Sequence, residues 1–291
     1  MYSVNPCSAN PMLVVIAADG SGSMSETMPQ SGMKKCDVLA TVVNKMIREL
    51  CIAAAKEVVK PYYELAVIYY SCNKVVNALS EIPALGEKMV NSIVKIEANP
   101  LRVETRKKKM FGPTGDVFEE NVPFPVWIGE PRAAGRTPMA AALQTVNDIV
   151  AAWVSAHPSA HPPVVINVTD GVATDASDDD LERLASSIKA LATDDGNTLL
   201  MNLHISNSEE ARPINYAAAE SSLDNQQAKL LWRMSSEIPS EMVPAVNAVL
   251  GDVTVAPGAR FVTFDGTDCD VSRFIEVGTR ATVPLLNHPP A

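Results

Sequence analysis

The sequence lacks any uninterrupted apolar run that approaches the roughly 18 to 20 residues of a membrane-spanning helix. Its first residues, MYSVNPCSANPM, contain no basic segment followed by an apolar one, so we expect no secretory signal peptide. These two absences predict a cytoplasmic protein that does not insert into a membrane.

Paired cysteines are also lacking. The five cysteines are odd in number, widely scattered and without a CxxC pair: Cys7, Cys36, Cys51, Cys72 and Cys269. Neither a disulfide framework nor a zinc site is therefore expected, and a reducing cytosol fits this composition best. Cys36 and Cys51 lie within a helical pattern and are expected to pack as small hydrophobic residues.

An excess of basic charge is missing as well. The formal net charge is −10 and the sequence pI is about 4.9, which argues against general binding to nucleic acid or to anionic membranes. The one basic run, RKKK at 106–109, is local. We interpret it as the solvated face of a loop, with a partner-docking patch as the alternative.

What the sequence does contain is the composition of an ordinary globular protein, with 47% hydrophobic and 20% charged residues over 291 positions. Short apolar runs alternate with amphipathic helical patterns. This alternation predicts an α/β fold with a doubly wound, mostly parallel central sheet, helices on both faces and one antiparallel edge strand.

One domain is the better interpretation of this pattern. We expect an N-terminal extension at 1–11, a single domain at 12–280 and a C-terminal tail at 281–291. Within the domain, 97–136 and 207–258 are interpreted as insertions. The first of them is rich in Pro and Gly and is expected to form loops with at most a short strand around Val122, Phe124 and Val126.

The expected strands lie at 12–18, 63–71, 74–82, 163–171, 198–206 and 260–266. The expected helices lie at 34–55, 86–96, 138–154, 178–192 and 270–279, with one or two more within 208–250. The strands at 63–71 and 74–82 are close enough in sequence to form a hairpin, which would place one of them antiparallel at an edge.

The stretch LVVIAADGSGSMSE ends an apolar strand on small oxygen-bearing side chains, with Asp19, Ser21 and Ser23 at every second position. One interpretation is a tight turn closed by hydrogen bonds between its own side chains and backbone. The other is a metal-binding loop, in which Gly20 and Gly22 let the chain fold closely around an ion.

Two further residues favour the metal. Thr137 lies in AAGRTPMAAAL, a glycine-containing loop that opens a helix, and Asp170 ends the strand PVVINVTDG. Ligands in open α/β sheets bind outside the carboxyl ends of the strands, so these loops are expected to meet. Two carboxylates and three hydroxyls form an all-oxygen set for a hard ion such as Mg²⁺, with Mn²⁺ or Ca²⁺ left open.

Five protein oxygens from three loops would crowd the ion if all bound directly. Some are therefore expected to act through water, which leaves a coordination position open to solvent. With about two negative charges in the set, the ion would remain electrophilic enough to accept an acidic oxygen from outside.

These residues resemble the metal-ion-dependent adhesion site of von Willebrand factor A (VWA) domains. Asp19, Ser21, Ser23, Thr137 and Asp170 match all five positions of that motif. The resemblance implies that the hydroxyls contact the ion, that the aspartates act largely through water, and that a Glu or Asp of a partner protein completes the shell. The late segment from LLWRMSSEIPSEM to RFVTFDGTD resembles stand-alone cytosolic bacterial VWA proteins, and this implies an AAA+ ATPase or a kinase–phosphatase pair as partner.

Three functions remain open. The first is a Mg²⁺-dependent protein-binding module or assembly scaffold without enzymatic activity, since none of the four histidines falls in the motif loops. The second is a metal-dependent hydrolase, such as a phosphatase, that uses Asp19. Such enzymes usually need a second acid two residues later, where Ser21 stands. The third is a structural VWA-like protein with an incidental metal.

Overall fold

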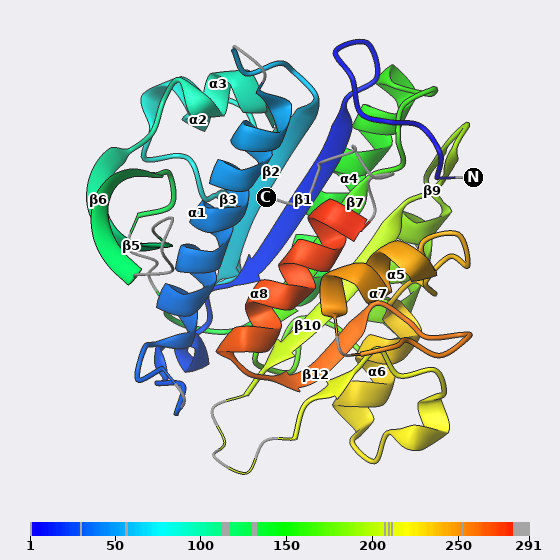
Figure 1. Ribbon diagram of the computed structural model, residues 1–291. Coiled ribbons are helices and arrows are strands. Elements are labelled where there is room, and N and C mark those ends of the chain that lie inside the picture. Colours follow the sequence, from blue (N-terminus) through cyan, green and yellow to red (C-terminus); the bar gives the residue numbers. More distant parts are fainter. Residues whose placement is uncertain are drawn as a thin grey trace.

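The computed structural model describes residues 2–29, 31–55, 58–111, 117–129, 133–206, 208, 210, 212–251 and 253–281 (Figure 1). Of residues 108–111, 117, 118, 280 and 281 it describes the backbone only. The tail expected at 281–291 therefore lies, apart from the backbone of Ala281, outside the described residues.

The fold is built on an eight-stranded sheet with the order β11-β12-β10-β7-β1-β2-β3, in which β4 also pairs with β2. The strands are β1 (Met12–Asp19), β2 (Tyr63–Ser71), β3 (Lys74–Asn77), β4 (Asn91–Ser92), β7 (Val164–Thr169), β10 (Leu199–Ile205), β11 (Ile214–Asn215) and β12 (Val262–Gly266). The pairs β1–β2, β1–β7, β7–β10 and β10–β12 are parallel.

This topology confirms the predicted α/β class with a doubly wound, mostly parallel sheet. The antiparallel edge expected at β3 is present, since β3 pairs antiparallel with β2. The structure adds the short antiparallel strands β4 on β2 and β11 on β12, so both edges of the sheet end in antiparallel pairs.

The burial of strand β1 explains why a continuous apolar run correctly predicted a strand of a parallel sheet. All eight of its residues are buried. Val14 and Ile16 belong to the core on one face of the sheet, whereas Leu13 and Val15 belong to the core on the other. Because both faces of a parallel sheet are covered, the strand shows no polar alternation.

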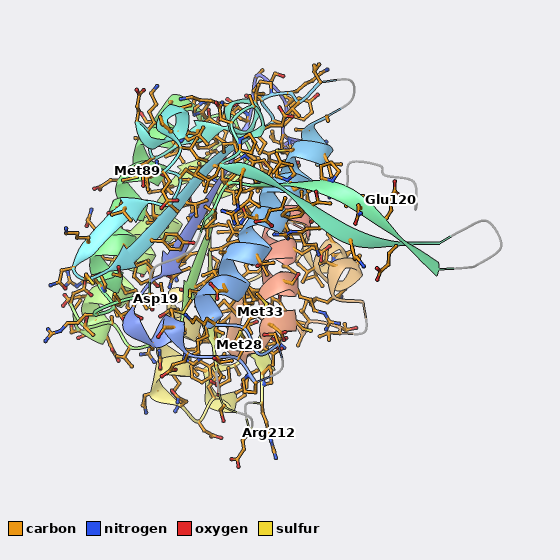
Figure 2. The ribbon with its side chains drawn as sticks, turned by 90° about the vertical axis from the view of Figure 1, so that its left-hand side faces the viewer. Asp19, Met28, Met33, Met89, Glu120 and Arg212 are labelled. Carbon is orange, nitrogen blue, oxygen red and sulfur yellow. The ribbon has the colours of Figure 1, made fainter. Side chains whose placement is uncertain are left out.

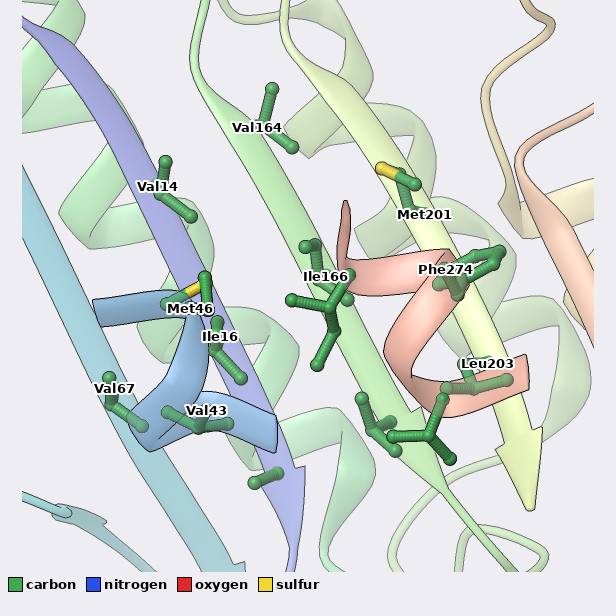
Figure 3. Close-up of a cluster of buried hydrophobic side chains, with 14 of the residues drawn as sticks. Val14, Ile16, Val43, Met46, Val67, Val164, Ile166, Met201, Leu203 and Phe274 are labelled. Atoms are coloured by element: carbon green, nitrogen blue, oxygen red, sulfur yellow. The ribbon is translucent and has the colours of Figure 1, made fainter. Parts of the chain in front are cut away.

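Helices cover both faces, as expected. One layer contains α1 (Lys35–Ala54), α3 (Ile93–Glu97), α7 (Val243–Leu250) and α8 (Asp268–Glu276), and the other contains α4 (Met139–Ala156), α5 (Asp178–Ala190) and α6 (Gln226–Met234). In Figure 1, α1 and α8 lie in front of the sheet and α4 lies behind it. Figure 3 shows the core of the first layer, where Val43 and Met46 of α1 lie over Ile16 of β1.

The loop structure expected for the segment 97–136 was wrong. The segment forms a long antiparallel hairpin of β5 (Arg102–Phe111) and β6 (Val117–Val126), which extends from the body of the protein (Figure 2). Pro123 and Pro125 hid the strand pattern. In the structure they lie two residues apart in a strand that, among the described residues, pairs with β5 alone. On the unpaired side of such a strand a missing N–H group costs no ladder hydrogen bond.

The basic run 106–109 accordingly lies in strand β5 and not in a loop. Within it, Lys107 forms an ion pair of 2.8 Å with Glu119 on the facing strand. The Arg106 guanidinium lies 3.7 Å from the ring centroid of Phe124, which is half-buried.

The region 74–96 also differs from the prediction. Strand β3 ends at Asn77, whose side-chain amide donates to the carbonyls of Leu85 and Lys88 and so closes a turn. The single helix expected at 86–96 is replaced by α2 (Pro83–Gly86) and α3, which are separated by β4. These buried asparagine contacts decide the local structure, and helical periodicity alone did not reveal them.

The other expected elements lie within a few residues of their predictions. The segment 207–258 contains β11, α6, α7 and a short 3-10 helix at Glu220–Ser222. The remaining small elements are a 3-10 turn at Gly22–Ser25, a hairpin of β8 (Ala192–Thr193) and β9 (Gly196–Asn197), and a π-turn at Val277–Ala281. In the part of the chain that the structure describes, no helix is both long and apolar enough to span a membrane.

Candidate metal centre

The predicted site residues lie where the strand order of the sheet reverses. From β1 the chain passes to β2 on one side, and it later returns to β7 on the other side of β1. Ala18 of β1 is in register with Val168 of β7, so Asp19 and Asp170 follow at neighbouring carboxyl ends. This reversal point is the expected ligand position in a doubly wound sheet.

The Asp19 carboxylate is almost completely buried, with 1% of the residue exposed. Its Oδ1 atom accepts a hydrogen bond of 2.8 Å from the Ser21 backbone amide, and its Oδ2 atom accepts one of 2.7 Å from the Thr169 hydroxyl. Burial raises the pKa of Asp19, and these two donors partly offset that effect. A cation nearby would favour the ionised form further.

The two serines continue from Asp19 toward Asp170. The hydrogen bond from the Ser21 amide to Asp19 closes the tight turn that was one interpretation of this stretch. The same turn also directs the two serine hydroxyls inward. Ser21 Oγ lies 3.1 Å from Ser23 Oγ, and the Ser23 hydroxyl donates to Asp170 Oδ1 at 2.7 Å. The turn and the cluster of oxygen atoms are therefore the same structure.

The loop that carries Thr137 is held against the first loop by backbone hydrogen bonds. The Ala134 amide donates to the Gly20 carbonyl at 2.8 Å, and the Gly22 amide donates to the Gly135 carbonyl at 3.0 Å. Gly135 has φ = 74° and packs closely against Cys72, so glycine is required there.

Thr137 is 5% exposed and lies beside the third loop. A Cβ atom added at Gly171 would come 3.6 Å from Thr137 Oγ1. The Thr137 carbonyl accepts a bond of 2.9 Å from the Thr174 amide. Its hydroxyl makes no hydrogen bond within the described part of the chain, so this oxygen remains available for a ligand.

All five residues predicted from the sequence thus meet at one edge of the sheet, from three loops. Their donor set of hydroxyl and carboxylate oxygens, with the unbonded Thr137 hydroxyl among them, fits a hard cation such as Mg²⁺. No three His, Cys, Asp or Glu side chains cluster in a metal-binding arrangement among the described residues. The set therefore depends on hydroxyls and differs from an all-carboxylate or a soft-metal site.

One charged residue of this site was missed from the sequence. The Lys35 ammonium lies 2.8 Å from Asp170 Oδ2 and 3.0 Å from Glu26 Oε2, and its side chain is 3% exposed. The sequence did contain a signal for it, because two lysines, Lys34 and Lys35, stand at the N-terminal end of α1. The positive end of the helix dipole disfavours cations there unless an anion faces them.

No protein-family profile and no curated protein matches this sequence. A von Willebrand factor type A protein is among the solved structures of similar fold. That protein, from Catenulispora acidiphila, is 16% identical, with a TM-score of 0.44 over 94% of this chain and 43% of its own.

Two pilus proteins have similar folds as well. The three N-terminal domains of the type V pili tip protein Mfa5 from Porphyromonas gingivalis are 15% identical, with a TM-score of 0.32 over 57% of this chain and 20% of that one. The pilus adhesin SpaC from Lactobacillus rhamnosus GG is 11% identical, with a TM-score of 0.48 over 96% and 31%. This chain spans less than half the length of each of the three proteins, and the likenesses concern the fold alone.

Proposed function

We propose that this chain is a protein-binding module or assembly scaffold that holds a divalent cation, Mg²⁺ in the first place, and binds an acidic side chain of a partner protein through it. The observation that carries the proposal is the convergence of Asp19, Ser21, Ser23, Thr137 and Asp170 at the strand-order reversal. Mn²⁺ and Ca²⁺ also favour oxygen ligands and remain candidates.

The charges of the site support an acidic partner. Asp19, Asp170 and Glu26 carry three negative charges and Lys35 carries one positive charge, so these four residues leave the site at about −2. A divalent ion offsets that charge and, when bound, would supply an electrophilic position for a carboxylate oxygen. The three hydroxyls are neutral and do not offset the charge of the ion.

The hydrogen bonds of Asp19 favour binding over hydrolysis. Each of its carboxylate oxygens already accepts a bond, one from the Ser21 amide and one from the Thr169 hydroxyl. These bonds stabilise the carboxylate and lower its nucleophilicity, which argues against an attacking role. We assign Asp19 the task of holding the ion through water.

The first test is metal binding by the chain itself. Free Mn²⁺ is followed by electron paramagnetic resonance with the wild-type protein, with Asp19→Ala, and with Asp148→Ala as a control. Asp148 is exposed on α4, and among the described residues its side chain is bonded only to Gln144 in the same helix. We expect the wild type and the control to bind one Mn²⁺, and Asp19→Ala to lose it.

The second test is a pull-down from native cell extract in Mg²⁺ or in EDTA with the same proteins. A partner retained only in Mg²⁺ and lost with Asp19→Ala supports the proposal. An AAA+ ATPase or a kinase–phosphatase pair, in the cytoplasm, is the partner class to examine first. A partner held equally in EDTA contradicts the proposal and favours a structural protein with an incidental metal. Phosphate-ester turnover lost in Asp19→Asn favours the hydrolase.

A further inference from the structure

An apolar pocket lies directly beside the candidate metal centre. It has a cavity volume of about 150 Å³ and is lined by the start of α4, the loop after β7, and helices α5 and α6. Its apolar lining residues are Met139, Val172, Ala173, Leu181, Leu230 and Leu231.

The pocket and the metal centre share a wall. Gly171 lines the pocket, follows Asp170 directly, and lies beside the Thr137 hydroxyl. The side-chain amide of Gln227 on α6 donates to the Gly171 carbonyl at 2.6 Å. This hydrogen bond holds α6, on the far side of the pocket, against the loop that carries Asp170. The distance between the pocket and the candidate metal centre is therefore set by the fold.

The size and lining of the pocket define its occupant. A volume of about 150 Å³ is large enough for a benzene ring, and the mostly apolar lining favours an apolar group. Val172, which is 61% exposed, extends the apolar surface to the rim. A single large apolar side chain such as Phe or Leu fits this volume.

The charges at the pocket and at the candidate metal centre favour different chemical groups at the two sites. Asp178 lines the pocket and is followed by Asp179 and Asp180 in the first turn of α5. Asp180 is paired with Arg183, so the Asp178 and Asp179 carboxylates are the ones that repel an acidic group from the pocket end, whereas a bound cation would attract it at the metal end. A peptide that carries one acidic and one apolar side chain can therefore bind in one direction only.

We propose that the pocket receives a Phe or Leu side chain of the same partner segment whose Asp or Glu approaches the metal centre. The proposal rests on the metal-dependent function above and specifies the partner. The partner segment carries an acidic residue with a large apolar residue a short, fixed distance away in sequence. Burial of that side chain strengthens binding by about 10- to 100-fold.

The test uses the full chain and a phage-displayed peptide library with a central Asp and four random residues on either side. Selection in Mg²⁺ is expected to enrich Phe, Leu or Met at one fixed offset from the Asp, and EDTA is expected to release these peptides. Mg²⁺-dependent peptides without such enrichment would overturn the pocket proposal and leave the metal-dependent function intact. Recovery of no Mg²⁺-dependent peptide contradicts both.

Matched variants then locate the apolar contact. Ala173→Phe fills the pocket, whereas Ala192→Phe adds the same ring at an exposed position of β8, away from the pocket. Binding of a selected peptide, measured by fluorescence anisotropy, is expected to weaken about 10- to 100-fold with Ala173→Phe and to stay unchanged with Ala192→Phe. The same peptide with Ala in place of its apolar residue should bind all proteins alike.

Two controls keep this result interpretable. Mn²⁺ binding and the melting temperature of Ala173→Phe are measured beside the wild type and should not change. Gln226→Trp covers the mouth of the pocket from an exposed position on α6, where it does not disturb the core, and should produce the same loss. Full peptide affinity in both filled variants would overturn the proposal.

Discussion

The Lys35 ammonium and the Asp170 carboxylate form a buried ion pair, with 2.8 Å between Nζ and Oδ2 and side-chain exposures of 3% and 0%. The other oxygen of the same carboxylate, Oδ1, accepts the Ser23 hydroxyl of the candidate metal site. Asp170 is therefore shared between an internal cation and the position proposed for an external one. We expect this sharing to stabilise the protein without metal and to weaken the affinity of the proposed site for its ion.

Lys35→Met is expected to reduce the stability of the metal-free protein by about 3–5 kcal/mol, because it leaves a buried carboxylate unpaired. Mg²⁺ should then raise the melting temperature more in this variant than in the wild type, since the ion restores the missing positive charge. Thermal unfolding with Mg²⁺ and with EDTA measures both effects. Lys45→Met, at an exposed position of the same helix, is the control. An equal Mg²⁺ shift in wild type and Lys35→Met would contradict the shared role of Asp170.

Thr169→Val removes the hydroxyl that donates to Asp19 Oδ2 at 2.7 Å. Loss of a hydrogen bond that orients a metal-site carboxylate typically weakens metal binding about 10- to 100-fold, so the affinity for Mn²⁺ should fall by about 10-fold or more. Titration followed by electron paramagnetic resonance measures this change. Thr263→Val also removes a buried hydroxyl, which donates to Asn215, but should leave Mn²⁺ affinity unchanged. The idea fails if both variants bind alike.

A chain of buried polar side chains crosses the sheet behind the site. The Tyr70 hydroxyl donates to Asn167, whose amide donates to Asn202, whose amide in turn donates to the Ser235 hydroxyl. Asn167→Leu leaves Asn202 Oδ1 without this donor and should lower the free energy of unfolding by about 1–3 kcal/mol. Urea denaturation measures it. Asn121→Leu, on the exposed hairpin, should change stability by less than about 0.5 kcal/mol.

Lys189 predicts a pH dependence of stability. Burial, together with the nearby Arg260, lowers the pKa of Lys189 to about 8. The unfolded chain holds this proton up to a pKa near 10.4, so between about pH 8 and pH 10 it binds more protons than the folded chain. The contribution of Lys189 to stability therefore rises with pH across this window.

Lys189→Met removes this effect. Measured by urea unfolding, the free energy of unfolding of the variant should rise relative to the wild type at pH 7. This advantage should be lost at pH 10. Lys229→Met, a half-buried position on α6, provides the comparison, and it should differ from the wild type by the same amount at both pH values. A pH-independent difference for Lys189→Met would contradict the lowered pKa.

Much of the fold was predictable because its signals are local. A strand buried on both faces, such as β1, appears as an apolar run, and α4 appears as hydrophobic residues at helical spacing. Where local signals conflicted, prediction failed. In β6, two prolines masked a strand that only its pairing with β5 makes stable, and at Asn77 and Asn91 side-chain bonds ended the expected elements.

The sequence by itself determined the chemistry of the candidate site: two aspartates, two serines and a threonine, each at the end of a strand or the start of a helix. Only the tertiary structure decided which other groups join them. Lys35 meets Asp170 across 135 residues, and the apolar pocket is assembled from α4, the loop after β7, α5 and α6. Such contacts depend on strand order and helix packing, which no short stretch of sequence encodes. Each contact arises only when segments distant in sequence pack into one common core.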